Sequence, residues 1–328
     1  MQKIYMEISD MINQLQSRGM IISDYSFAEE TIKKENYYKL INGYKELFID
    51  KSCSYPTETY KNGTNFNEIV TVYNFDQKLK NIFIKKIFCI ENNVKSIVAT
   101  VFSKKYGHQN YLKISNFDCM TDSNPPVQSK DKICDIINLM ASLQNEISKQ
   151  LNKNNLMITH YLLKYGYIPL WVLVNILSFG TISIFYGNMK KADQNDVARS
   201  FNTKPEIMKT FLHNLTIYRN ACAHDERLYS LKTLKRNGKP NCIAQIDIHS
   251  LLSIPKLPNG NLQYGVNDLY SVVIIFKKLL YKDRFDSFID SLSYLVDELK
   301  NKLSTISIND VLDKMGFPIN WLDIKAIK

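Results

Sequence analysis

Arginine and histidine are both rare in this chain, and one short segment brings them together. This segment is Tyr218-Arg219-Asn220-Ala221-Cys222-Ala223-His224. Histidine exchanges protons near neutral pH, and arginine is a planar cation that binds a phosphate through two hydrogen bonds. Such a pair can cleave RNA without a metal. His224 would move the proton of a 2′-hydroxyl or of the leaving 5′-oxygen, and Arg219 would meet the charge on the phosphate. The residue types therefore indicate acid–base cleavage of a phosphodiester.

The spacing also limits how these side chains can meet. Asn220 and His224 are four residues apart and share one face of a helix. Arg219 lies about 140° from His224 around an ideal helix, so the two border one groove only at its rim or across a two-fold interface. A simpler interpretation stays open, in which the helix dipole favours His224 at a C-terminus and Arg219 forms a salt bridge.

Charge is unevenly distributed along the 328 residues, whose net charge is +10. Residues 51–250 hold 26 basic and 15 acidic residues, a net of +11, whereas residues 1–50 have a net of −2 and residues 251–328 a net of +1. Only six of the 42 basic residues are arginine, and three of them, Arg219, Arg227 and Arg236, fall within eighteen positions. A basic middle indicates a polyanionic partner such as RNA, although a basic protein without such a partner fits equally well.

Helical periodicity dominates the elements that must position this segment. A long helix is expected over 66–99 with Asn67 as its cap, an earlier helix is expected after Ser26, and Pro125-Pro126 marks a linker. We therefore predict an all-α fold with a minor β-hairpin after the motif, where Cys242-Ile243-Ala244-Gln245-Ile246-Asp247-Ile248-His249 reads as extended. The predicted parts are 1–120 (N-terminal helical region), 121–129 (linker), 130–230 (helical core with the motif), 231–265 (basic loop or hairpin) and 266–328 (C-terminal helices).

Residues 165–189 contain no charged side chain and are long enough to span a bilayer. Its apolar part begins after Pro169 and is interrupted by Ser178-Phe179-Gly180-Thr181, so we expect two short buried helices, one ending near Gly180 and one capped by Thr181. A membrane-acting toxin is the alternative.

Cysteine spacing and the first residues indicate a reducing compartment. The six cysteines include no C-x-x-C pair, and the start carries early acidic residues and no apolar core of a signal peptide. We expect a cytoplasmic protein that requires no metal or other cofactor. Cys222, His224, Asp225, Glu226 and His213 diverge around a helix and make a closed metal site improbable on geometric grounds.

The sequence resembles the abortive-infection (Abi) proteins of the AbiD/AbiF type, which belong to the HEPN ribonuclease superfamily. The resemblance covers about residues 15–230 and rests on a series of ordered blocks: Arg18-Gly19-Met20, Asn36-Tyr37-Tyr38-Lys39-Leu40, Gly43-Tyr44, Phe66, Tyr73-Asn74-Phe75-Asp76, Leu79-Lys80, Ile90-Glu91, His160-Tyr161, Pro169-Leu170-Trp171, Ser178-Phe179-Gly180, Ser183, Tyr186, Arg219-Asn220-Ala221-Cys222-Ala223-His224 and Arg227-Leu228.

The resemblance implies a HEPN-type helical bundle whose R-N-x-x-x-H motif is completed by a second copy in a homodimer. It implies an endoribonuclease toxin of phage defence, in some relatives restrained by a small non-coding RNA. Arg219, His224 and Asn220 would be catalytic, with Asn220 orienting His224 or touching RNA. The chain departs from the family by Lys at 39, 80 and 95, where Arg is frequent, and by Asn175, where Glu is frequent. Asp225 and Glu226 would weaken phosphate binding or orient Arg227.

Several further side chains are candidates for holding RNA. The basic residues after the motif would bind the phosphate backbone of RNA, although a solvated loop explains them equally well. Aromatic residues between 37 and 73 would stack on bases unless they belong to the core. The candidates are Arg227, Lys232, Lys235, Arg236, Lys239, Tyr37, Tyr38, Lys39 and His160, with Tyr44 and Tyr73 as further aromatics. A non-catalytic protein that holds a small structured RNA is the second hypothesis.

Overall fold

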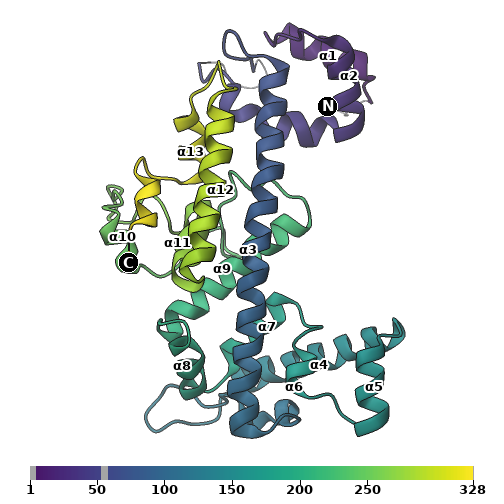
Figure 1. Ribbon diagram of the computed structural model, residues 1–328, viewed down its shortest axis with the longest axis vertical. Coiled ribbons are helices and arrows are strands. Elements are labelled where there is room, and N and C mark those ends of the chain that lie inside the picture. Colours follow the sequence, from purple (N-terminus) through teal and green to yellow (C-terminus); the bar gives the residue numbers. More distant parts are fainter. Residues whose placement is uncertain (1–4, 53–57, 328) are drawn as a thin grey trace.

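The computed structural model describes residues 5–52 and 58–327, and this part of the chain is mostly helical, with irregular connections (Figure 1). Pairing between extended segments is limited to isolated bridges, and these residues form no sheet, which confirms the all-α class. The elements are α1 (Ile8–Ser17), α2 (Tyr25–Glu35), η1 (Tyr38–Asn42), η2 (Lys45–Phe48), α3 (Phe66–Tyr106), η3 (Asn110–Leu112), η4 (Ile114–Asn116), α4 (Lys130–Asn152), α5 (Leu156–Tyr165), α6 (Leu170–Leu173), α7 (Phe179–Asn188), α8 (Lys191–Arg199), α9 (Pro205–Ala223), α10 (Asp247–Leu251), α11 (Leu269–Leu279), α12 (Lys282–Lys300), α13 (Ile308–Met315) and η5 (Trp321–Lys325).

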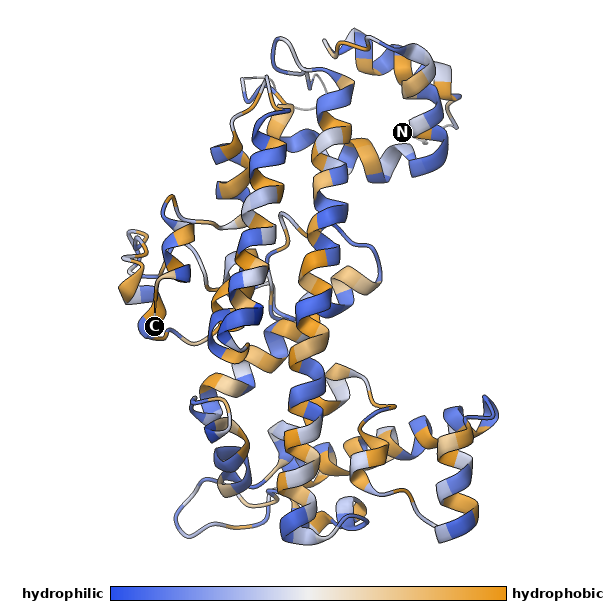
Figure 2. Cartoon of the chain, in the orientation of Figure 1, coloured by the Kyte–Doolittle hydropathy of each residue, from blue (hydrophilic) through white to orange (hydrophobic). Residues whose placement is uncertain are grey.

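Helix α3 is the axis of the molecule. Its 41 residues extend about 60 Å. It packs against α6, α7, α8, α9 and α12. Blue and orange alternate along both α3 and α12 in Figure 2, the pattern of amphipathic helices with one face in the core. The cap of α3 differs from the prediction. Asn65 is the N-cap, and its side chain accepts the Asn67 N–H at 2.9 Å.

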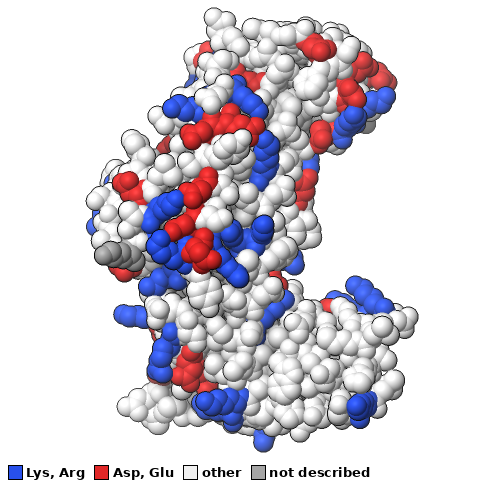
Figure 3. All heavy atoms as spheres, viewed as in Figure 1, with Lys and Arg blue, Asp and Glu red and all other residues white. Residues whose placement is uncertain are grey.

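Different helices pack at the two ends of α3 (Figure 1). Helices α1 and α2 with η1 lie beside its N-terminal end, and α4 and α5 form an arm that projects near its C-terminal end. The molecular outline is hollowed between them on one side (Figure 3). Helix α2 begins one residue before Ser26, because Asp24 accepts the Phe27 N–H at 2.9 Å and is therefore the N-cap.

The uncharged stretch folds as two short helices, α6 and α7, as predicted, but the first helix ends at Leu173 rather than near Gly180, which lies inside α7. Ser178, rather than Thr181, caps α7 by accepting the Thr181 N–H at 3.1 Å. Leu173, Ile182 and Phe185 are fully buried. Within residues 5–52 and 58–327, no helix has the length and apolar character needed to cross a bilayer.

The segment after the motif is irregular, and the strand predicted over Cys242–His249 is not formed. The backbone N–H of Ile243 donates to Val266 O, and that of Ala244 donates to the Thr210 hydroxyl, so no neighbouring strand supplies a ladder. The segment then enters α10, where the His249 ring accepts the Ile246 N–H at 3.1 Å. Two bridges, Leu234 with Pro240 and Lys256 with Leu262, are the strand-like contacts of this region.

Candidate active site

Helix α9 ends at the R-N-x-x-x-H motif. His224 is its C-cap and donates its backbone N–H to Asn220 O at 2.9 Å. Asp225 then adopts a φ of 55°, which turns the chain, and Glu226 N–H returns to Ala221 O at 2.9 Å. Motif and turn thus form one compact helix end.

The three motif side chains differ in exposure. His224 and Asn220 are exposed, and neither side chain hydrogen bonds to another described residue. Asn220 therefore does not orient His224 in this structure, and both are available to a ligand. The Arg219 side chain keeps 29% exposure, because one edge of it lies against α3.

A buried carboxylate on α3 faces Arg219. Glu91 Oε2 lies 3.8 Å from Arg219 Nε, and Glu91 Oε1 lies 2.7 Å from Lys95 Nζ. The Arg219 guanidinium also lies over Phe88, 5.9 Å from the ring centroid. The Glu91 side chain is 6% exposed. Arg219 therefore forms the salt bridge that the simpler interpretation predicted. The distance of 3.8 Å is too long for a direct hydrogen bond, and neither Arg219 Nε nor Glu91 Oε2 has a hydrogen-bond partner elsewhere.

Asp225 is held by two lysines from distant parts of the chain. Lys39 of η1 and Lys80 of α3 each donate to its carboxylate, and the Lys80 side chain is 5% exposed. Burial raises the pKa of Asp225, but the hydrogen bonds and charges of Lys39 and Lys80 outweigh it, so its pKa lies below the usual range. The negative charge beside His224 is therefore matched by two cations rather than left to repel phosphate.

A second carboxylate of α3, Asp76, fixes the chain after the turn. It is fully buried and accepts the N–H groups of Leu228 at 3.1 Å and Tyr229 at 2.7 Å, together with the Tyr44 hydroxyl at 2.7 Å. Burial raises the pKa of Asp76, and these donated hydrogen bonds oppose the rise. Asp76 thus ties residues 225–229, the motif loop, to the middle of α3.

The aromatic candidates divide between core and surface. Tyr44 stacks on Tyr229 with centroids 5.5 Å apart and meets Tyr73 edge-on at 5.4 Å, so Tyr44 and Tyr73 are core residues. Tyr37 is half-buried. Tyr38 is 72% exposed and precedes Lys39, which binds Asp225. Tyr38 is therefore the aromatic candidate that is both exposed and beside the motif loop.

The basic candidates lie in two places. Arg227 donates to Gly43 O and so ties the motif loop to the N-terminal region, which gives it a structural contact in addition to any role with RNA. Lys232, Lys235, Arg236 and Lys239 are exposed and form no ion pair with any described residue. Their turn, closed by the Lys235 N–H to Lys239 O bond, is anchored through Thr233 to Asn267 just before α11 rather than to η1 or α3.

His160 lies on α5, where its ring packs edge-on against Tyr161 and Tyr165. Helix α5 belongs to the projecting arm (Figure 1), so one chain does not bring His160 to Arg219 and His224. Figure 3 shows basic and acidic side chains intermixed near α11 and α12 on the face in view, and a largely uncharged surface over the arm. The positive excess of the sequence is therefore not gathered into one patch on this face.

Cys222 lies inside the motif, and burial raises the pKa of its thiol to about 12, which disfavours the thiolate that binds metals. Among the described residues, no group of three or more His, Cys, Asp and Glu side chains is placed to hold a metal ion.

Comparison with known proteins places this site in a family. The family model described as "Abi-like protein" matches residues 30–230. The chain belongs to the Abi-like protein family. The matched region includes η1, α3 and the whole motif loop, so the contacts that Asp76, Lys80 and Glu91 make in this Abi-like protein lie within it. No curated protein and no solved structure matches the chain. Membership associates the protein with abortive infection, a defence of bacteria against phage.

Sequence reasoning did not pair Glu91 with Arg219 or Asp76 with the motif loop. An available signal was the position of Asp76 and Glu91 on the largely apolar face of α3, because a buried acid needs partners.

Proposed function

We propose that this Abi-like protein is a metal-independent endoribonuclease toxin of the HEPN type, of the AbiD/AbiF kind, acting in the bacterial cytoplasm. The observation that carries the proposal is the end of α9, where an exposed His224 and a partly exposed Arg219 occupy an R-N-x-x-x-H motif fixed by Asp76, Lys80 and Glu91.

In the proposed reaction, His224 accepts the proton of a 2′-hydroxyl as its oxygen attacks the adjacent phosphorus. Arg219 stabilises the charge on the non-bridging oxygens, and the bond to the 5′-oxygen breaks. A protonated histidine returns a proton to that leaving oxygen. The products carry a 2′,3′-cyclic phosphate and a 5′-hydroxyl, so atoms and protons balance without an oxidant or a water molecule.

A homodimer would complete the site. Arg219 turns toward α3, whereas His224 is exposed, so one copy offers separated groups at one helix end. A second copy related by a two-fold axis would supply a second histidine as the acid. A small non-coding RNA would restrain the toxin, and the exposed cations after the motif favour an RNA over a protein in this role.

The test is RNA degradation in EDTA by the wild-type protein and by His224→Ala. We expect products with cyclic phosphate ends from wild type and a loss of at least about 100-fold with the variant, since general acid–base groups contribute about 10²–10⁴-fold. His213→Ala is the matched control, because His213 is exposed on the same helix. Equal degradation by wild type and His224→Ala contradicts the proposal.

A non-catalytic RNA-binding protein is the second candidate, favoured by the ion pair that holds Arg219 against Glu91. It predicts tight, salt-dependent RNA binding that survives His224→Ala, with no cleavage products.

A further inference from the structure

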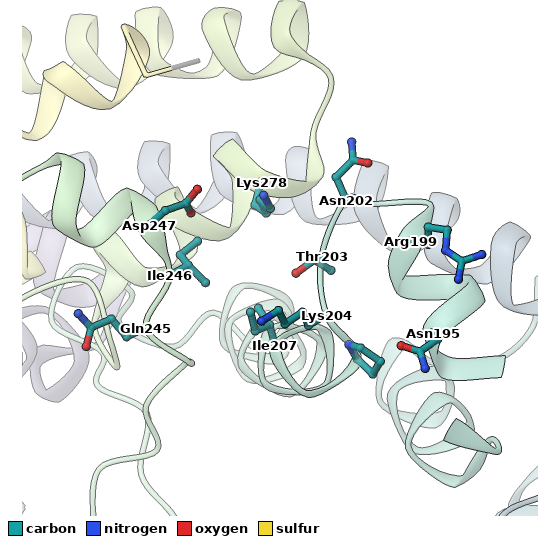
Figure 4. Close-up of a pocket in the computed structure, with 11 residues that line it drawn as sticks. Asn195, Arg199, Asn202, Thr203, Lys204, Ile207, Gln245, Ile246, Asp247 and Lys278 are labelled. Atoms are coloured by element: carbon teal, nitrogen blue, oxygen red, sulfur yellow. The ribbon is translucent and has the colours of Figure 1, made fainter. Parts of the chain in front are cut away.

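A cavity of about 630 Å³ lies before the first turn of α9, at the end opposite to the motif (Figure 4). Its walls come from the end of α8, the connection to α9, the residues that lead into α10, and Lys278 of α11. Helix α9 has 19 residues, so the cavity is separated from His224 by about 28 Å along the helix. It is therefore distinct from the proposed cleavage site.

The cavity is lined by three cations and one acid. Lys204 and Lys278 form no ion pair with any described residue, and Arg199 has a long contact of 3.5 Å with Asp196, both largely exposed. Exposed pairs of this kind are weak. Against these cations the lining holds Asp247 alone, so the cavity attracts anions.

The cavity lies at the start of α9. The Thr203 hydroxyl oxygen that borders it is itself buried, so a ligand in the cavity would not reach it. Figure 4 looks along α9 from its first turn, with Thr203 and Lys204 in front of the helix. The Lys204 side chain does not cap α9, and Pro205 occupies the first turn, so the N–H groups that follow it add to the positive potential.

The remaining lining is suited to an organic group attached to the anion. Ile207 and Ile246 give apolar surface, and the amides of Asn195 and Gln245 offer donors and acceptors. A volume of 630 Å³ is within the range of about 300–1,000 Å³ of small-molecule sites, and it is far larger than inorganic phosphate requires.

We propose that this cavity binds a nucleotide, with its phosphate at Lys204 and Lys278 and its base against Ile207 and Ile246. The nucleotide is either free or the 5′-phosphorylated end of an RNA strand, since both present the same chemistry. The proposal concerns binding alone and does not depend on cleavage at His224.

The test measures binding to the full-length His224→Ala protein, which keeps RNA probes intact if the proposed cleavage occurs. The probes are AMP, UMP, inorganic phosphate, and one ten-residue RNA with either a 5′-phosphate or a 5′-hydroxyl. We expect at least one 5′-phosphorylated probe to bind at least tenfold more tightly than inorganic phosphate. Preference for AMP or UMP identifies a free nucleotide, and a 5′-phosphate effect on the RNA identifies a strand end.

One pair of substitutions assigns the binding to this cavity. Lys204→Met with Lys278→Met should raise the dissociation constant at least tenfold. Neither lysine forms an ion pair with a described residue, so the fold should be kept, as thermal unfolding would verify. Lys300→Met, which changes an exposed lysine at the far end of α12, should have no effect. Absence of binding at 1 mM, equal binding of inorganic phosphate, or binding that the lysine pair leaves unchanged would overturn the proposal.

Discussion

The carboxylate of Asp76 lies 2.7 Å from the backbone nitrogen of Tyr229, 153 residues further along the chain. This hydrogen bond joins the middle of the fold to the loop that follows His224. Because the Asp76 carboxylate is fully buried, the N–H groups that donate to it could not bond to water if the carboxylate were removed.

Asp76→Asn should destabilise the protein, because an amide presents a donor to one of the N–H groups that Asp76 now accepts. We expect the free energy of unfolding to fall by about 1–3 kcal/mol in urea denaturation, the cost of leaving a buried donor unpaired. Tyr44→Phe is the control, since it removes one donor and leaves both backbone bonds, and it should cost about 1 kcal/mol. Equal effects of the two variants would contradict this account of the loop.

Glu91→Gln should leave Arg219 and Lys95 facing each other without their shared anion. Removing one partner of a buried pair costs about 3–5 kcal/mol, and the partial exposure of Arg219 reduces this to about 2 kcal/mol in chemical denaturation. Adding Arg219→Met should then cost less than the same change in the wild-type background. If the two changes are additive, Glu91 and Arg219 are not coupled.

Sequence patterns predicted the helices and the motif at a helix end, because apolar periodicity is local. They misplaced the N-caps predicted at Ser26, Asn67 and Thr181 by two or three residues, since the cap is decided by which backbone residue leaves the helical conformation. They gave no pairing for Lys80 with Asp225 or Glu91 with Arg219, because contacts between distant segments depend on how α3 and α9 cross. The strand predicted over 242–249 was wrong for a related reason. The backbone of this segment bonds to a loop and to a threonine side chain, and these partners lie far away in the sequence.

The Asp225 clamp should depend on pH. Its pKa is lower in the folded protein than in the unfolded chain, so its stabilising effect is present above the unfolded value of 3.8 and is lost as the pH falls through the folded value. We expect wild type to have a higher Tm than Asp225→Asn at pH 7, with the difference narrowing below pH 4. A difference that is the same at pH 7 and pH 3 would contradict the ionised clamp.

Asp268, the N-cap of α11, should give the opposite dependence. Burial raises its pKa to about 7, so the folded protein holds this proton more tightly than the unfolded chain. The contribution of Asp268 to the free energy of unfolding is therefore fully present below pH 4. It is lost as the pH rises through the folded pKa of about 7, and the loss is up to about 4 kcal/mol. Asp268→Asn retains an acceptor for the Ser271 N–H and should flatten the profile of Tm between pH 4 and pH 7. A profile with unchanged slope would refute this assignment.

The basic turn after the motif should contribute to RNA binding through charge alone. Replacing Lys235, Arg236 and Lys239 by Gln removes three exposed cations without breaking an ion pair among the described residues. If all three contact phosphates of a single strand, the slope of log K against log salt should become less steep by about 2. Lys300→Gln is the control. An unchanged slope would show that the turn does not touch RNA.

Helix α3 carries Asp76, Lys80 and Glu91, the three residues that contact the motif and the motif loop. Lys80 and Glu91 are eleven residues apart, close to three full turns, and this places both toward α9. A deletion of one residue between them would rotate everything beyond it by about 100° and shift it by 1.5 Å. Side chains along this helix can therefore be exchanged one at a time during evolution, whereas its length between these residues cannot drift, and an insertion there should be far more damaging than any substitution.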